Sequence, residues 1–198
     1  MPRVTDQYVQ RRRREILAAA RRRFARDGFH ATTMDDVIAE AGVSSSVVYR
    51  WFSGKDELVA ACVSEALEGV VEVLEESLRV EPPVPVAEAV RRVVTAILER
   101  TSYDGQDLSA VVVHAWAEAM RAPAVRDLLG GIYTRIRQGL AELVRRHQAA
   151  GTMPVQLDAD AVAYPLFSLV PGFIVQHLVL GTEETGAYAG AIEQLLRG

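Results

Sequence analysis

Apolar side chains recur at intervals of three and four residues along almost the whole of this 198-residue chain. Such spacing places them on one face of an α-helix, whereas a half-buried strand requires strict alternation. We find no alternating stretch long enough for a sheet and no internal repeat. The sequence therefore predicts an all-α protein. The clearest apolar series is Val125, Leu128, Leu129, Ile132, Tyr133, Ile136, Leu140, Leu143 and Val144.

Capping signals indicate where the helices begin and end. Thr33 and Asp36 have the spacing of a capping box, in which each side chain bonds the backbone of the other, and Ser53 and Asp56 share that spacing. Gly42 follows the second helix, as a C-terminal glycine does. The predicted helices span about residues 8–27, 33–41, 45–52, 56–80, 86–101, 107–121, 124–149, 158–180 and 184–197.

Charge is distributed unevenly along the chain, although the net charge is only −4. Residues 1–26 carry nine Arg against two acidic residues, whereas residues 61–198 carry eleven Arg against eighteen acidic residues. A basic segment joined to an acidic remainder indicates that one end of the chain meets a polyanion. The alternative is a run of solvated charges on a helix surface, and a DNA-binding motif is needed to choose between the two interpretations.

The single cysteine, Cys62, excludes an intrachain disulfide and a thiolate metal cluster, so we expect a reducing, cytoplasmic location. Residues 161–180 carry no charge and are numerous enough to span a bilayer. Pro165, Pro171 and Gln176 interrupt this stretch, and no cationic cluster flanks it. We therefore interpret it as a helix buried within or between subunits.

A basic helix followed by two short helices around a glycine turn is the arrangement of a helix-turn-helix DNA reader. Gly42 supplies the turn. The second helix of such a pair enters the major groove, where its exposed side chains meet phosphates and base edges. The candidates for hydrogen bonds are Ser44, Ser45, Ser46, Tyr49 and Arg50, and the candidate for a thymine methyl contact is Val47.

Two segments, TTMDDVIAEAGVS at residues 32–44 and VYRWFSGKDEL at residues 48–58, resemble the DNA-binding signature of the TetR family of one-component transcriptional repressors. The resemblance covers about residues 10–58. It implies a three-helix DNA-binding domain, predicted as residues 1–54, and a helical ligand-binding and dimerisation domain, predicted as residues 55–198. It also implies a dimer on a pseudo-palindromic operator, released by a small molecule.

The resemblance places the family's DNA contacts on matching positions. Tyr49 matches the recognition-helix tyrosine, Lys55 the lysine at the start of the long helix, and Thr33 the capping hydroxyl of the second helix. A cation beside a helix N-terminus can also clamp a phosphate. Trp51 stands where the family usually has His or Tyr, and its indole N–H can donate to a phosphate or pack. Ser46 replaces a frequent Gly. The basic first helix adds Arg11 and Arg14.

Aromatic and other apolar residues of the second domain can line a ligand pocket with a few polar groups. Filling of the core is the alternative for each of them. No excess of acidic residues accompanies them, so we expect a neutral or weakly polar, small hydrophobic effector. The predicted effector-binding residues are Val70, Leu74, Tyr103, His114, Trp116, Met120, Tyr133, Tyr164 and Phe167.

The last two predicted helices carry more apolar surface than one small subunit can cover. We therefore predict a homodimer with a four-helix interface. The predicted interface residues are Phe173, His177, Ala187, Tyr188, Ala191, Ile192 and Leu195.

Other classes of function compete with a ligand-responsive regulator. A helical enzyme using the C-terminal cavity would need convergent catalytic groups, and the four His are scattered without a metal-ligand spacing. A helix-turn-helix regulator without a small-molecule ligand is a further alternative. A purely scaffolding domain would not need a basic first helix. We expect no enzyme activity, no cofactor, no metal site and no membrane partner.

Overall fold

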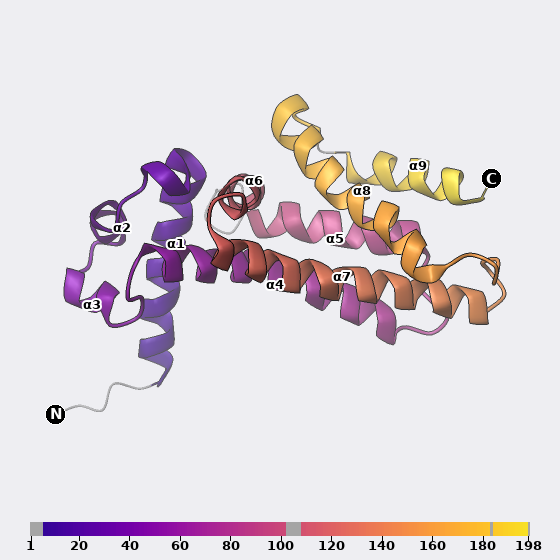
Figure 1. Ribbon diagram of the computed structural model, residues 1–198, viewed down its shortest axis with the longest axis horizontal. Coiled ribbons are helices and arrows are strands. Elements are labelled where there is room, and N and C mark those ends of the chain that lie inside the picture. Colours follow the sequence, from indigo (N-terminus) through magenta and orange to yellow (C-terminus); the bar gives the residue numbers. More distant parts are fainter. Residues whose placement is uncertain (1–5, 102–107, 183, 198) are drawn as a thin grey trace. The chain divides into compact units, whose positions relative to one another are not determined.

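The computed structural model describes residues 6–101, 108–182 and 184–197, and all regular elements in these residues are helices. The predicted fold class and the nine predicted helices are confirmed (Figure 1). The helices are α1 (Asp6–Ala31), α2 (Met34–Ala41), α3 (Ser45–Tyr49), α4 (Lys55–Arg79), α5 (Val86–Thr101), α6 (Leu108–Ala119), α7 (Pro123–Ala149), α8 (Ala159–Leu180) and α9 (Thr185–Arg197).

The chain forms two compact units. The N-terminal unit contains α1, α2, α3, α4 as far as Ala66, and α6 with the start of α7. The C-terminal unit contains α4 from Leu67, α5, α7 from Leu129, α8 and α9. The middle of the sequence therefore contributes a helix, α6, to the unit that holds the short N-terminal helices.

The predicted capping box of α2 is confirmed. The Asp36 N–H donates to the Thr33 hydroxyl at 3.2 Å, and the Thr33 N–H donates to the Asp36 carboxylate at 2.8 Å. At the start of α4 the predicted partner is wrong, because the Ser53 N–H and hydroxyl donate to Glu57 at 2.7 and 2.8 Å, one residue beyond Asp56. A residue four positions along lies on the same helix face and reaches back.

The third helix is shorter than predicted, since it ends at Tyr49 and not near residue 52. The N–H groups of Trp51 and Phe52 both donate to the Val48 carbonyl at 3.0 Å, which closes the last turn. Phe52 then points into the core, where its side chain is 2% exposed. This inward turn of the chain takes it out of the helix and toward α4.

The N-terminal unit is stabilised by an apolar core and by ion pairs between its helices. The pairs join α1 to α2 and α4, and they are partly buried, so they fix geometry better than fully solvated pairs do. They are Arg21–Glu65, Arg22–Glu40 and Arg23–Asp36, each 2.8 Å long. The largest buried side chains of this core include Ile16, Leu17, Phe24, Val37, Val48, Phe52 and Leu58.

The C-terminal unit has a separate core between α5, α8 and α9. Its buried members are Ala87, Val90, Val94, Phe173 and Ile192. Their spacing along α5, at three and four residues, is the helical stripe that the sequence displays.

α8 has the length and apolarity of a membrane-spanning helix, with a mean hydropathy of 1.5 over 18 residues, and 22% of that window is buried inside the chain. Pro165 and Pro171 lie within it. The Asp158 carboxylate caps its start, accepting from the N–H groups of Asp160 and Ala161. Ten of the 22 residues of α8 are exposed in a single copy of the chain, and seven more are half-buried.

Candidate nucleic-acid interface

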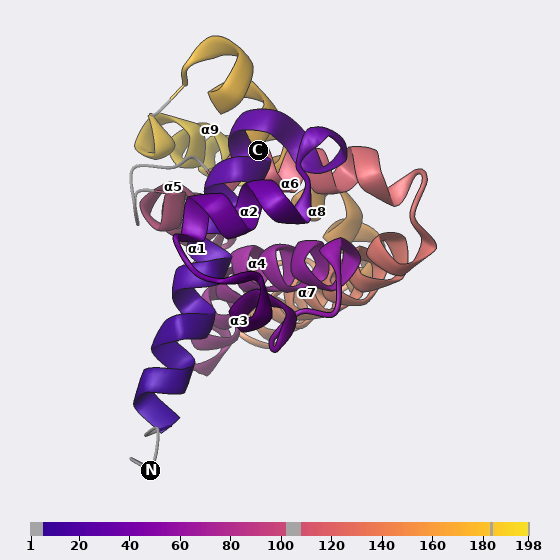
Figure 2. The same cartoon turned by 90° about the vertical axis from the view of Figure 1, so that its left-hand side faces the viewer.

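α2 and α3 form a helix-turn-helix on one side of α1 (Figures 1 and 2). Gly42 ends α2 with φ 63° and ψ 31°, a left-handed conformation that glycine adopts without a Cβ penalty, and its N–H donates to the Ala39 carbonyl at 3.2 Å. Two residues later Ser44 begins the turn into α3. A short rigid connection of this kind fixes the angle between the two helices.

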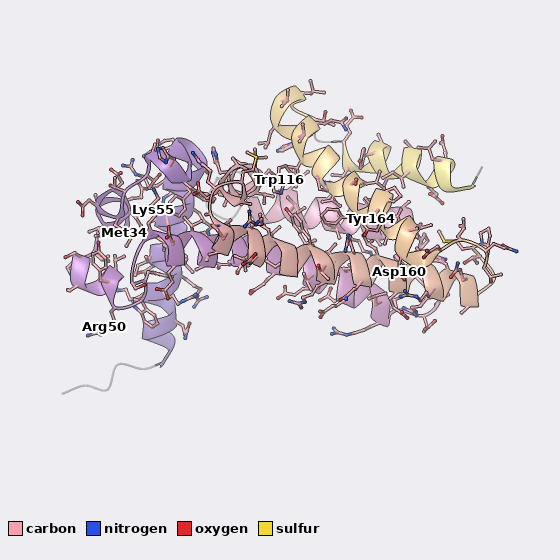
Figure 3. All side chains as sticks on the ribbon, in the orientation of Figure 1. Met34, Arg50, Lys55, Trp116, Asp160 and Tyr164 are labelled. Carbon is pink, nitrogen blue, oxygen red and sulfur yellow. The ribbon has the colours of Figure 1, made fainter. Side chains whose placement is uncertain are left out.

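The predicted base-reading residues lie on α3 and at its two caps, Ser44 and Arg50. Val48 is fully buried and anchors the helix, while Tyr49 is 50% exposed and Arg50, labelled in Figure 3, is also exposed. Val47 and Trp51 are half-buried. The α3 face can therefore present both donors and apolar surface to a groove. Its exposed hydroxyl groups are those of Ser44, Ser45 and Ser46, with the first and last 3.1 Å apart.

Lys55 lies at the first residue of α4 and is held in place by the backbone of another segment. Its Nζ donates to the His30 carbonyl at 3.2 Å. An ammonium has three donors, so this bond leaves two for a phosphate. The helix dipole of α4 also favours an anion at this point.

Arg11 and Arg14 are exposed on α1. The Arg11 Nε lies 3.6 Å from Glu15, and the Arg14 Nε donates to the Gln10 carbonyl at 3.4 Å. Both are weak, solvent-accessible contacts that a phosphate can replace. The adjacent Arg13 is used internally, with its guanidinium 5.6 Å from the centre of the Phe52 ring.

Thr33 is exposed, but its hydroxyl serves the capping box of α2. The Thr33 hydroxyl and N–H hold the pKa of the Asp36 carboxyl below its usual value. Asp36 therefore stays charged near neutral pH and keeps α2 capped. The sequence predicts that Thr33 caps α2 and contacts the DNA backbone. The structure shows the cap, and the DNA contact stays a prediction.

The predicted effector-binding residues fall in both units. Val70 and Leu74 are buried on α4 in the C-terminal unit, where the Tyr133 and Phe167 rings lie 4.9 Å apart. Tyr164 (Figure 3) is 58% exposed, under the Arg137 guanidinium at 4.4 Å. His114 and half-buried Trp116 lie on α6, in the N-terminal unit. Met120 follows the end of α6, and its side chain is 79% exposed. Tyr103 lies outside the described residues.

A groove of about 240 Å³ lies between α4 and α7 in the C-terminal unit. Gly139 forms part of it, and a Cβ at this position would lie 2.6 Å from the Leu74 Cδ2, so the two helices approach closely there. Glu75 and Arg135, which form an ion pair 3.2 Å long, also line it. Among the predicted effector residues that the structure describes, Leu74 is the one that lines the groove. The lining residues are Val71, Leu74, Glu75, Leu78, Arg135, Gln138 and Gly139.

The predicted interface residues divide into buried and exposed groups. Phe173 and Ile192 are 1% and 5% exposed within one copy, where a second copy cannot touch them. Tyr188 is half-buried and donates to the Leu169 carbonyl at 2.7 Å. The His177 ring stacks on Phe173. Ala187, Ala191 and Leu195 are exposed. α8 also exposes apolar side chains that are not among the predicted interface residues, namely Val175, Leu178, Val179 and Leu180.

The described residues include the metal-ligating residue types and the single cysteine, Cys62. No cluster of three or more His, Cys, Asp or Glu there is placed to hold a metal ion. Burial raises the pKa of the Cys62 thiol to about 12, so this cysteine stays a neutral thiol.

Two family descriptions match the sequence. "Bacterial regulatory proteins, tetR family" matches residues 16–62, which contain the helix-turn-helix. "BetI-type transcriptional repressor, C-terminal" matches residues 85–197, more than half of the chain.

Similar proteins resemble the chain over nearly its whole length. The regulator UidR of Escherichia coli strain K12 is 24% identical over 190 residues, which cover 96% of this chain and 93% of UidR. The structure of Salmonella enterica GusR has a TM-score of 0.78 at 25% identity and covers 98% and 97%. A transcriptional regulator from Saccharomonospora viridis, solved with choline, has a TM-score of 0.69 at 27% identity and covers 93% of each chain. Together with the exposed helix-turn-helix, these matches establish that the chain belongs to the TetR family of helix-turn-helix transcriptional regulators.

Proposed function

We propose that this regulator is a cytoplasmic repressor that binds a pseudo-palindromic operator as a homodimer. Residues 1–54 supply the DNA-binding domain and residues 55–198 the ligand-binding and dimerisation domain. Two copies of α3 enter successive major grooves, about 34–36 Å or a multiple of that distance apart. The observation that carries the proposal is the exposure of Tyr49, Arg50 and the three serines on α3 and its two caps, together with the anchored Lys55 at the start of α4.

The dimer interface is proposed on α8 and α9. Support comes from the large uncovered fraction of the apolar α8 and from Leu195 of α9, which is 82% exposed. Val179 and Leu180 are 74% and 72% exposed. Burying such side chains against a second copy stabilises by roughly 25 cal/mol for each Å² removed from water. Phe173 and Ile192 act indirectly, by supporting these helices from inside.

The effector is proposed to be a small hydrophobic molecule bound among apolar residues of the C-terminal unit. Buried Val70 and Leu74 and the Tyr133–Phe167 ring pair support this choice. Choline, a small cation, is a second candidate because the Saccharomonospora viridis regulator was solved with it. A thermal-shift screen that compares choline with neutral hydrophobic compounds of similar size separates the two classes.

Operator binding is tested by selecting a duplex from a random 30-base-pair library and measuring affinity across salt concentrations. Lys55→Ala should lower the slope of log K against log salt by about one per subunit, hence by about two for a dimer. At 0.15 M salt this corresponds to about 30-fold weaker binding. Arg79→Ala, which removes a 73% exposed cation of the C-terminal unit, is the control and should keep the slope.

A wild-type protein that selects no duplex would contradict the proposal. So would an unchanged slope in Lys55→Ala, because that lysine is the proposed phosphate contact.

A further inference from the structure

The connection between α1 and α2 begins with a kink. Gly28 has φ 77° and ψ 166°, a region of backbone conformation almost confined to glycine. The chain then closes a turn, in which the Thr32 hydroxyl and N–H donate to the Gly28 carbonyl at 2.8 and 3.4 Å. We call residues 28–32 the kink turn. It leads directly to Thr33, the N-cap of α2.

A histidine of α6 fills the space beside the kink. A Cβ built on Gly28 would lie 3.3 Å from the His114 Cε1 and 3.5 Å from its Nδ1. The His114 ring also lies 6.1 Å from the ring of Phe29, which is 3% exposed and packs edge-on against buried Phe24 at 4.8 Å. All these residues belong to the N-terminal unit. The His114 ring therefore packs directly against the backbone of the kink turn.

The same turn holds the cation at the start of α4. His30 is its central residue, and the His30 carbonyl accepts the bond from Lys55 Nζ at 3.2 Å. A free lysine side chain loses much rotamer freedom when it is fixed on a phosphate. A lysine side chain that is already held by a hydrogen bond loses less conformational entropy when it binds a phosphate. The position of the His30 carbonyl therefore affects how well Lys55 serves as a phosphate contact.

We propose that His114 is a positioning residue for operator binding: its ring, packed on Gly28, fixes the kink turn so that the His30 carbonyl holds Lys55 where a phosphate arrives. The inference rests on the proposed function, because it requires Lys55 to contact DNA. His114 itself touches no DNA. Its effect passes from α6 through the kink turn to the first residue of α4.

The test compares His114→Ala, Lys55→Ala and the double variant on the selected duplex over a range of salt. His114→Ala should lower the salt slope by one to two for a dimer, as Lys55→Ala does, with about fivefold to 30-fold weaker binding at 0.15 M salt. The double variant should match Lys55→Ala alone, because both changes remove the same contact. A merely structural defect lowers the active fraction and leaves the slope unchanged.

His114→Phe is the rescue variant, because it keeps a planar ring against Gly28 and beside Phe29. We expect it to restore the wild-type slope. Arg121→Ala, which removes a 60% exposed cation just beyond α6, is the matched control and should behave as wild type. If thermal unfolding shows that His114→Ala does not fold, His114→Leu replaces it, since leucine keeps the volume but not the plane.

Three results would overturn the inference alone: a wild-type slope in His114→Ala, a double variant with an additive loss of slope, or failure of His114→Phe to restore it. In each case Lys55→Ala still lowers the slope, so the proposed function stands. An unchanged slope in Lys55→Ala would overturn both.

Discussion

At the scale of single residues, two glycines within helical segments differ in whether their positions tolerate a side chain. Gly28 has a positive φ and lies against the His114 ring. Gly130, on α7, is exposed, and apart from its own turn of helix nothing lies within 4 Å of where a Cβ would be. A side chain is therefore costly at the first position and favourable at the second.

Gly28→Ala should lower the free energy of unfolding by about 1–3 kcal/mol, because alanine adopts this backbone conformation only under strain. The ring of His114 must also move by a few tenths of an ångström. Urea-induced unfolding followed by circular dichroism measures the change. A variant as stable as wild type would show that the kink relaxes at little cost.

Gly130→Ala should raise the free energy of unfolding by about 0.5–1 kcal/mol, since alanine loses less backbone freedom in a helix than glycine does. The same unfolding experiment measures it. Destabilisation would mean that another surface packs on this exposed part of α7.

The arginines of α1 also differ from one another at this scale. Sequence composition treats residues 11–14 and 21–23 alike, as parts of one basic segment. The structure assigns the second group to ion pairs with α2 and α4. Their acidic partners are 13 to 44 positions away in the sequence, so no local pattern reveals them.

At the scale of helices, the first turn of α5 is stabilised by one carboxylate shared between two arginines. Glu88 accepts hydrogen bonds from Arg91 at 2.6 and 2.7 Å and from Arg92 at 2.9 Å. The Arg91 hydrogen bonds, with a smaller contribution from Arg92, hold the pKa of Glu88 at about 2, against 4.5 normally.

Glu88→Gln should lower the thermal unfolding midpoint at pH 7, and its difference from wild type should shrink as the pH falls from about 5 toward 2. The pKa of Glu88 is lower in the folded protein, at about 2, than in the unfolded chain, at 4.5. The charged carboxylate therefore contributes its full stabilisation above about pH 4.5 and loses it as the pH falls toward 2 and Glu88 binds a proton. Glu68→Gln, on an exposed position of α4, is the control and should change stability at pH 7 by less than about 0.5 kcal/mol. A deficit in Glu88→Gln that persists at pH 2 would show that the loss is not electrostatic.

At the scale of the whole molecule, the exposed apolar residues of α8 and α9 are the proposed dimer interface. Val179 and Val155 are equally exposed, at 74% and 72%, but Val179 lies on α8 and Val155 lies in the connection before it. A charge at each position therefore compares the proposed interface with an ordinary surface.

Val179→Glu should convert the dimer to monomer at micromolar concentration and weaken operator binding, because a buried unpaired carboxylate opposes association. Val155→Glu should remain dimeric. Light scattering after size-exclusion chromatography measures both masses. Dimeric Val179→Glu would place the interface elsewhere.

The sequence by itself determined the nine helices, the cap of α2 and the helix-turn-helix. These features depend on residues close together in the chain: apolar spacing, Thr33 with Asp36, and Gly42 in its left-handed turn. Local conformational preference and apolar periodicity determine these features, so the family resemblance and the exposed residues of α3 can be predicted from the sequence.

Only the tertiary structure decided which apolar face meets which neighbour. Phe173 and Val179 are both apolar residues of α8, yet one is buried in the C-terminal core and the other is exposed. Likewise, nothing in the sequence places His114 beside Gly28 or Lys55 beside the His30 carbonyl. Periodicity states that a helix has an apolar face, but the hydrophobic effect is non-directional, and the partner is selected by packing among segments far apart in the chain.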